Sequence, residues 1–100
     1  MSEAPAAPPP GPPNTRTVTI VNRRGLHARA AARFVKTAER FKAEVIVARK
    51  DQVVSGLSIM GLMMLAAAPG ATLELRASGP EAEAALEALT KLVADKFDED

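Results

Sequence analysis

The order of strand-like and helix-like segments constrains the fold of this chain more than any other feature of its sequence. Short strand-like segments occur at residues 17–21, 44–49, 53–55 and 72–78. Helical spacing of apolar residues occurs at residues 28–41, 59–67 and 80–97. The resulting order, β-α-β-β-α-β-α, predicts an α+β domain with an antiparallel sheet and helices on one face.

Apolar stripes identify the side of each helix that we expect to face the core. The first stripe consists of Ala31, Phe34, Val35, Ala38 and Phe41. The last stripe consists of Ala82, Ala85, Leu86, Leu89, Leu92, Val93 and Phe97. We expect Ser78 or Gly79 to cap this last helix and Pro80 to be its first residue. In the short middle helix, the residues expected to pack inward are Ile59, Leu62 and Leu65.

Length and composition indicate a single folded domain. A chain of 100 residues, 47% of them hydrophobic, can form one core, whereas halves of that length would bury too little surface to fold separately. Residues 1–14 contain six of the eight prolines, which predicts a disordered Pro/Ala-rich arm before a domain at residues 15–100. We expect this arm to be a passive tail rather than a ligand for an SH3-type domain.

The residues that the sequence lacks disfavour several kinds of site. The chain has no Cys and a single His, which excludes disulfides, thiolate sites and multi-histidine metal clusters. A site made of carboxylates alone stays open, but we expect no metal and no cofactor. The start lacks the features of a signal peptide, and the apolar run Ile59–Pro69 is shorter than the roughly 20 residues that a membrane helix needs. We therefore expect a soluble, cytoplasmic protein.

A net charge of only +1 conceals a separation of charge along the chain. Residues 16–50 carry a charge of +8, whereas residues 51–100 carry −6. Basic residues share one face of the first helix, at Arg29, Arg33, Lys36 and Arg40, and are preceded by Arg23 and Arg24. This face is either an ordinary solvated surface or a docking surface for an acidic partner. Nucleic acid is disfavoured, because all three Phe lie on predicted buried stripes and none is left to stack on bases.

The segment Gly25–Arg29 has the residues of an anion site. Gly25 permits a sharp turn, and His27 follows at the entrance of the first helix, where backbone N–H groups lack intrahelical partners. These groups and the guanidinium of Arg29 could hold a negative charge beside the imidazole. The residues alone therefore allow two interpretations: a histidine that accepts a phosphoryl group, or one that only caps the helix.

Two motifs in this chain resemble those of the HPr family, the phosphocarriers of the bacterial phosphoenolpyruvate:sugar phosphotransferase system. The first is Gly25-Leu-His-Ala-Arg29, followed by Ala30-Ala31 and Phe34-Val35. The second, Ser58-Ile-Met-Gly61, begins 31 residues after His27, and Pro69-Gly-Ala-Thr72 leads into the last strand. The resemblance covers about residues 16–97. One position departs from it, because Ala30 stands where the family usually has Pro and leaves one more backbone donor near the site.

This resemblance implies a fold, a role and a set of partners. The fold would be an open-faced β-sandwich, with a four-stranded antiparallel sheet covered on one side by three helices. His27 would accept a phosphoryl group on Nδ1 from enzyme I, with phosphoenolpyruvate as its source, and pass it to enzyme IIA components. Arg29 would stabilise that group. The protein would be a carrier that partner enzymes modify, not an enzyme itself, and we expect it to be a monomer.

Ser58 has both a structural and a regulatory interpretation. Its position before an apolar segment predicts a helix N-cap. The resemblance implies that it is also the serine phosphorylated by HPr kinase/phosphorylase. The short helix has more apolar residues than one core-facing stripe requires, so we expect an exposed patch for partner binding that includes Leu57, Ile59, Met60 and Met63.

Two rival functions stay open beside the sugar-transport phosphocarrier. One is the nitrogen-branch regulator of the same family, an NPr-like protein whose output is the control of other proteins. The other is a regulatory or nucleic-acid-binding module that keeps the fold but relays no phosphoryl group. The predicted partner-binding residues are Arg23, Arg24, Arg29, Arg33, Lys36, Leu57, Ile59, Met60 and Met63.

Overall fold

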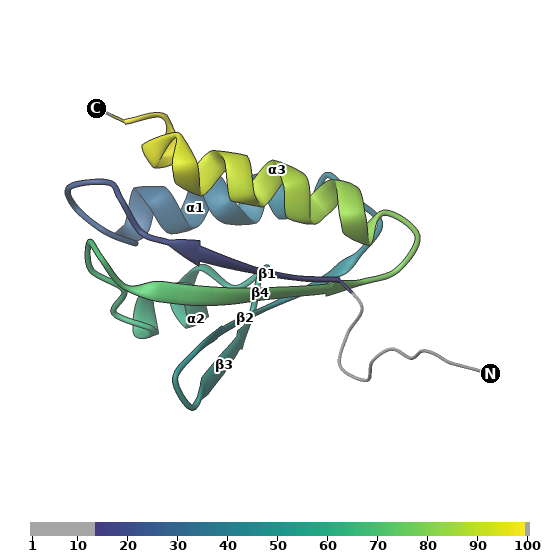
Figure 1. Ribbon diagram of the computed structural model, residues 1–100, viewed down its shortest axis with the longest axis horizontal. Coiled ribbons are helices and arrows are strands. Elements are labelled where there is room, and N and C mark those ends of the chain that lie inside the picture. Colours follow the sequence, from purple (N-terminus) through teal and green to yellow (C-terminus); the bar gives the residue numbers. More distant parts are fainter. Residues whose placement is uncertain (1–13, 100) are drawn as a thin grey trace.

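The computed structural model describes residues 14–99. In it, a four-stranded antiparallel sheet packs against three helices (Figure 1). The strands are β1 (Asn14–Thr19), β2 (Glu44–Arg49), β3 (Gln52–Ser55) and β4 (Thr72–Ser78). The helices are α1 (Ala28–Ala38), α2 (Ile59–Met64) and α3 (Ala82–Ala94), followed by a 3-10 turn, η1 (Lys96–Asp98). The predicted element order and α+β class are confirmed.

The sheet has the strand order β1-β4-β2-β3, so the last strand in the sequence lies in the middle. β4 pairs antiparallel with β1 on one side and with β2 on the other. In this register Val18 lies opposite Leu73 and Val47 lies opposite Leu75, which places apolar residues from three strands together on the inner face.

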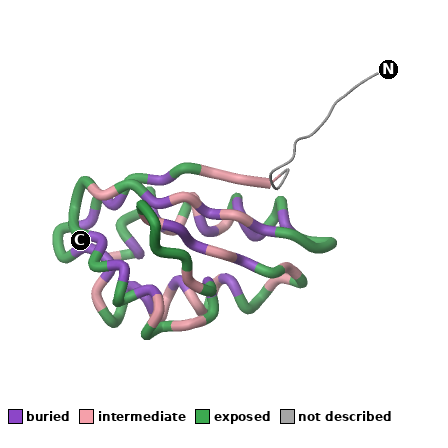
Figure 2. The backbone as a smooth tube through the Cα atoms, turned by 90° about the horizontal axis from the view of Figure 1, so that it is seen from below, coloured by how far each residue is buried: buried purple, intermediate pink, exposed green. Residues whose placement is uncertain are grey.

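One hydrophobic core joins the sheet to all three helices. It contains Phe34 of α1, Leu62 of α2 and Leu86 of α3, together with Val47 and Leu75 of the sheet, all at most 1% exposed. Because the three helices share this core, they cover the same face of the sheet, and α2 packs beside α1 and β3. Figure 2 shows the resulting alternation of buried and exposed segments along the strands.

Several predicted boundaries are wrong by a few residues. β1 begins at Asn14, three residues before the expected strand, so Asn14 belongs to the sheet and not to the arm. The remainder of the predicted arm lies outside the described residues. α1 ends at Ala38, and beyond its cap the N–H groups of Arg40 and Phe41 bond to carbonyls three residues back, yet Phe41 still packs against the core. α2 ends at Met64, because Ala66 adopts a positive φ of 52°.

The cap of α3 also differs from the prediction, because Glu81 and not Ser78 or Gly79 precedes the first helical residue. The Glu81 backbone N–H instead donates to the Lys42 carbonyl, and the Glu81 carboxylate accepts a hydrogen bond from the Lys42 backbone N–H. These two bonds connect the start of α3 to the loop after α1. α3 ends at Ala94, and Phe97 reaches the core from η1 rather than from the helix. Ile59 was expected to pack inward, but it is 40% exposed.

Candidate functional site

His27 is the N-cap residue of α1 and is presented by a tight turn. Gly25 has a φ of +70°, and its carbonyl accepts a hydrogen bond from the His27 N–H at 2.9 Å. The Leu26 N–H bonds to the Ala67 carbonyl at 2.9 Å, which anchors the turn to the segment after α2. The backbone of His27 is extended, and its side chain makes no capping hydrogen bond. The His27 side chain therefore does not cap the helix in this structure, and the first-turn N–H groups lack intrahelical partners.

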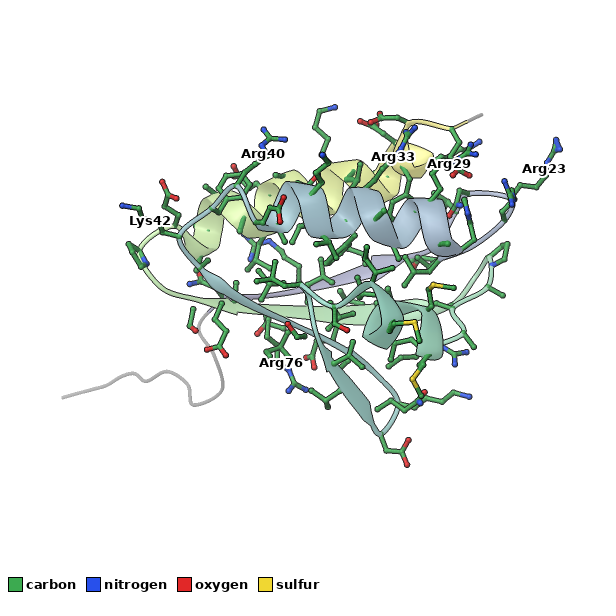
Figure 3. All side chains as sticks on the ribbon, turned by 180° about the vertical axis from the view of Figure 1, so that it is seen from behind. Arg23, Arg29, Arg33, Arg40, Lys42 and Arg76 are labelled. Carbon is green, nitrogen blue, oxygen red and sulfur yellow. The ribbon has the colours of Figure 1, made fainter. Side chains whose placement is uncertain are left out.

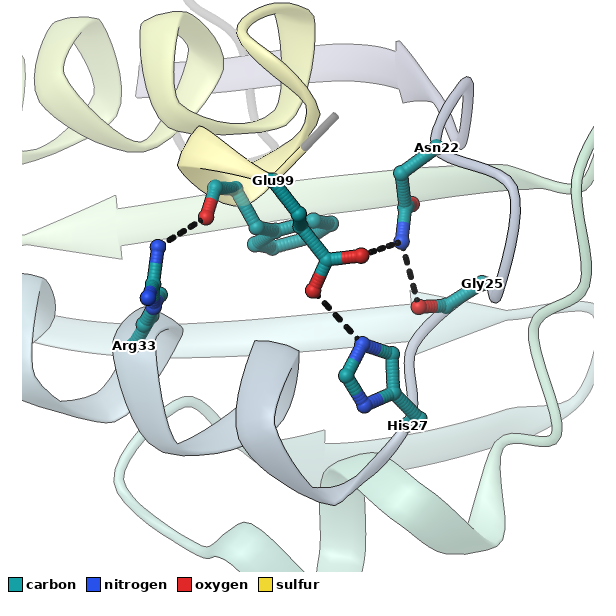
Figure 4. A network of polar contacts seen from close by, with 6 residues as sticks. Asn22, Gly25, His27, Arg33 and Glu99 are labelled. Atoms are coloured by element: carbon teal, nitrogen blue, oxygen red, sulfur yellow. Dashed lines mark hydrogen bonds and ion pairs between the residues drawn. The ribbon is translucent and has the colours of Figure 1, made fainter.

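The imidazole belongs to a polar network that joins residues 22–27 to Glu99 near the end of the chain (Figure 4). His27 Nε2 lies 2.7 Å from a carboxylate oxygen of Glu99, and the two side chains are only 16% and 17% exposed. Asn22 is fully buried, and its amide donates to the Gly25 carbonyl at 2.8 Å and to the other oxygen of Glu99 at 3.3 Å. The sequence interpretation missed both Asn22 and Glu99.

The Glu99 carboxyl is ionised near neutral pH. The hydrogen bond with His27 is the main cause that holds the pKa of Glu99 below its ordinary value, and the hydrogen bond from Asn22 acts in the same direction. Partial burial opposes both, and the positive charge of Arg24 adds a smaller lowering. An ionised carboxylate can only accept hydrogen bonds, so His27 Nε2 carries the hydrogen in this contact.

Three arginines and Glu99 line a surface hollow of about 370 Å³ beside this network. The arginines are Arg23 and Arg24, from the loop before the turn, and Arg29, from the first turn of α1. The structure thus brings Arg29 to the site at which the sequence predicted it. The hollow combines guanidinium donors with the positive end of α1, an arrangement that suits an anion with several oxygens.

The remaining basic residues of α1 lie farther along the helix. In Figure 3, Arg29, Arg33 and Arg40 project from α1 on the side away from the sheet, with Arg29 nearest the loop of Arg23. Arg33 is not free for the hollow, since its guanidinium donates to the Phe97 carbonyl. Lys36 is exposed, as expected for a docking surface or a solvated one.

Ser58 is the N-cap of α2, as predicted, and its Oγ accepts a hydrogen bond from the Gly61 N–H at 2.9 Å. Apolar side chains around it are exposed and form a patch, which we call the α2 patch: Leu57, Ile59, Met60, Met63 and Met64. The exposed fraction of Met60 reaches 70%. The structure therefore confirms an apolar surface on this helix but does not test what binds it.

Within residues 14–99, no three His, Asp or Glu side chains are grouped so that they could hold a metal ion. None of the helices in this part of the chain is long and apolar enough to cross a membrane.

Replacing Glu99 should change how stability depends on pH. Because the pKa of Glu99 is lowered in the folded state from its ordinary value of 4.5, its ionised form stabilises the fold above that pH, and this contribution is lost as pH falls through the lowered pKa. We expect Glu99→Gln to be less stable than the wild type at pH 7, with the difference shrinking toward pH 3. Urea unfolding of both proteins from pH 7 to pH 3 measures this difference in stability. A difference that stays constant across the range would contradict a lowered pKa for Glu99.

Comparison with known proteins places these features in a family. Residues 14–95 match the family model described as "PTS HPr component phosphorylation site". The phosphocarrier protein HPr of Neisseria meningitidis is 49% identical over 84 residues, covering 84% of this chain and 94% of that protein. The phosphocarrier protein NPr of Shewanella violacea is 44% identical, covering 84% and 92%.

A solved structure shows the same fold. The crystal structure of HPr from Thermoanaerobacter tengcongensis matches with a TM-score of 0.82 and 41% identity, covering 86% of this chain and 97% of that one. The family match spans His27 and its turn, Arg29 and Ser58, and the sheet and helices are those of the solved relative. The chain therefore belongs to the HPr family of phosphocarrier proteins of the phosphotransferase system.

Proposed function

We propose that this protein is a cytoplasmic phosphocarrier in which His27 receives a phosphoryl group from phosphorylated enzyme I and passes it to enzyme IIA components. The observation that carries this proposal is the position of His27 at a helix entrance, with no capping bond and with an arginine-lined hollow beside it. Members of this family carry a phosphoryl group and do not catalyse its transfer themselves.

The geometry suits transfer of a phosphoryl group to a ring nitrogen of His27. The unprotonated ring nitrogen, Nδ1, attacks phosphorus while the bond between phosphorus and the donor group of enzyme I breaks, so that one bond to phosphorus replaces another. Arg29 and the first-turn N–H groups receive the charge of the phosphoryl oxygens. Ala30 supplies a backbone N–H that a proline at this position would lack.

Incubation with enzyme I and phosphoenolpyruvate, followed by intact-mass measurement, tests the proposal. We expect the protein to gain one phosphoryl group that acid treatment removes, as expected for phosphohistidine. If the protein gains no phosphoryl group under conditions in which a known HPr is modified, the carrier function is refuted.

The nitrogen-branch alternative has a specific observation in its favour, the 44% identity to an NPr. The two branches differ in the protein that accepts the phosphoryl group. We favour the sugar branch because the HPr of Neisseria is 49% identical. Transfer from the phosphorylated protein to a sugar-specific enzyme IIA, measured against transfer to a nitrogen-branch acceptor, distinguishes the two.

We further propose that HPr kinase/phosphorylase phosphorylates Ser58. Its half-buried Oγ would have to leave the Gly61 N–H, after which a phosphate at the same helix start could accept that hydrogen bond. We expect kinase and ATP to add an acid-stable phosphate to the wild type and to Ser55→Ala, but not to Ser58→Ala. Persistence of the phosphate in Ser58→Ala would show that another residue is modified. This variant should also lose about 1 kcal/mol of stability with its N-cap.

Partner docking is proposed to use the arginines of the hollow, the exposed face of α1 and the α2 patch, with the protein acting as a monomer. Lys36→Glu should weaken binding to enzyme I several-fold at low salt, because it reverses a charge on this face. Lys91→Glu, which makes the same change on α3, is the matched control and should bind like the wild type. Binding of the wild type to enzyme I, measured by calorimetry at two ionic strengths, should also weaken as salt is added. An affinity that does not depend on salt would mean that the basic face is only a solvated surface and not a docking surface.

A further inference from the structure

We propose that Glu99 and Asn22 are positioning residues for His27: the carboxylate, held by the Asn22 amide, accepts the Nε2 hydrogen and fixes the tautomer whose unshared electron pair is on Nδ1. The inference rests on the proposed function, since it concerns the nitrogen that would attack phosphorus. Glu99 lies outside residues 14–95, the part of the chain that matches the family model. The positioning role is therefore inferred from the geometry of this chain.

A turn near the end of the chain places Glu99 beside the imidazole. Lys96, Phe97 and Asp98 have φ values of 59°, 55° and 62°, so three successive non-glycine residues adopt the left-handed conformation. Such a conformation is unfavourable for L-residues and persists where surrounding contacts fix it. Here the Phe97 ring is fully buried in the core, and the Phe97 carbonyl accepts a hydrogen bond from Arg33 of α1. The turn redirects the chain so that Glu99 lies over His27 (Figure 4).

Asn22 links the carboxylate to the same turn that presents the histidine. Its buried amide nitrogen donates both to the Gly25 carbonyl and to Glu99. Since the Gly25 carbonyl also accepts from the His27 backbone N–H, one peptide group fixes Asn22 and His27 together. Asn22 thereby holds the Glu99 carboxylate, and the Gly25 carbonyl holds the backbone of His27. Together these bonds fix the position of the carboxylate relative to the ring.

The chemical consequence concerns both ring nitrogens. With the hydrogen held on Nε2 by Glu99, the unshared pair stays on Nδ1, and Figure 4 shows this second nitrogen on the side of the ring turned away from Glu99. When Nδ1 forms its bond to phosphorus, the ring becomes positively charged and no proton has to leave. The carboxylate at Nε2 stabilises that charge, as a buried aspartate does for a catalytic histidine.

Nuclear magnetic resonance of the ¹⁵N-labelled full chain tests this inference, because long-range ¹H–¹⁵N spectra distinguish the two imidazole tautomers. At a pH where the ring is neutral, we expect the wild type to show the Nε2–H form. Glu99→Gln should show a mixture of tautomers and a several-fold slower phosphorylation by enzyme I. Asp98→Asn is the matched control: it removes one carboxylate charge from the neighbouring residue, and Asn tolerates the left-handed conformation, so both readouts should stay at wild-type values.

The outcomes separate the two proposals. If Glu99→Gln keeps the wild-type tautomer, or changes the tautomer without slowing transfer, the positioning role is wrong while the carrier function stands. If the wild type takes up no phosphoryl group, the carrier function fails and the tautomer of Glu99→Gln alone decides whether Glu99 positions the ring. Restoration of the tautomer and of most of the rate by Glu99→Asp would support a role for the carboxylate itself.

Discussion

His27→Ala is expected to accept no phosphoryl group from enzyme I and phosphoenolpyruvate, while it keeps the wild-type fold. His27 is the only histidine in the chain, so no other imidazole can replace it. Its side chain makes no capping bond to α1, and its one described hydrogen bond is to Glu99. Its removal should therefore leave the core and the sheet intact. Intact-mass measurement detects the loss of phosphorylation, and circular dichroism with thermal unfolding tests the fold.

A second readout shows whether His27→Ala has removed the intended contact. The hydrogen bond with His27 is the main cause of the lowered pKa of Glu99, so this pKa should rise toward its ordinary value in the variant. His27→Gln is the matched control for side-chain volume and should also take up no phosphoryl group. An acid-labile phosphoryl group on either variant would place the acceptor elsewhere and refute the assignment of His27.

The sequence predicted the sheet and the helices because burial leaves a local periodic pattern. The bounds of β2 and β4 agree with the expected segments, and the stripe residues Phe34, Leu86 and Phe97 are buried. Ile59 was misplaced because α2 has only six residues. In so short a helix, Leu62 and the following Leu65 are sufficient to fill the space above the sheet, and Ile59 at the first position is left at the surface.

The candidate site was predictable only as far as its residues are neighbours in the sequence. His27 and Arg29 lie within one motif, and the structure brings both to the same end of α1. Glu99 is 72 residues from His27 and 77 from Asn22, so no local pattern relates them. Its approach also depends on a left-handed turn at Lys96–Asp98, where no glycine or asparagine indicates a change of direction.

Gly25→Ala is expected to cause the largest loss of stability among substitutions near the site. A Cβ at this position would lie 2.6 Å from the Ala67 carbonyl oxygen, in a backbone conformation with φ of +70°. The unfavourable φ and the steric overlap together should cost about 2–4 kcal/mol. For a domain of this size the melting temperature should fall by roughly 10–30 °C. Because Ala67 also accepts the Leu26 N–H, relief of the overlap must shift the turn that presents His27.

Gly70→Ala separates the two causes. Gly70 also has a positive φ, of +93°, but beyond its own residue and its two chain neighbours no atom lies within 4 Å of the position of its Cβ. It should therefore lose only about 1 kcal/mol, the cost of the left-handed conformation alone. If the two variants lose equal stability in urea unfolding, the contact with Ala67 is not what requires glycine at position 25. If Gly25→Ala is less stable as expected, its phosphorylation should also be slower than that of Gly70→Ala under conditions in which both are folded, because only the first substitution displaces the turn beside the imidazole.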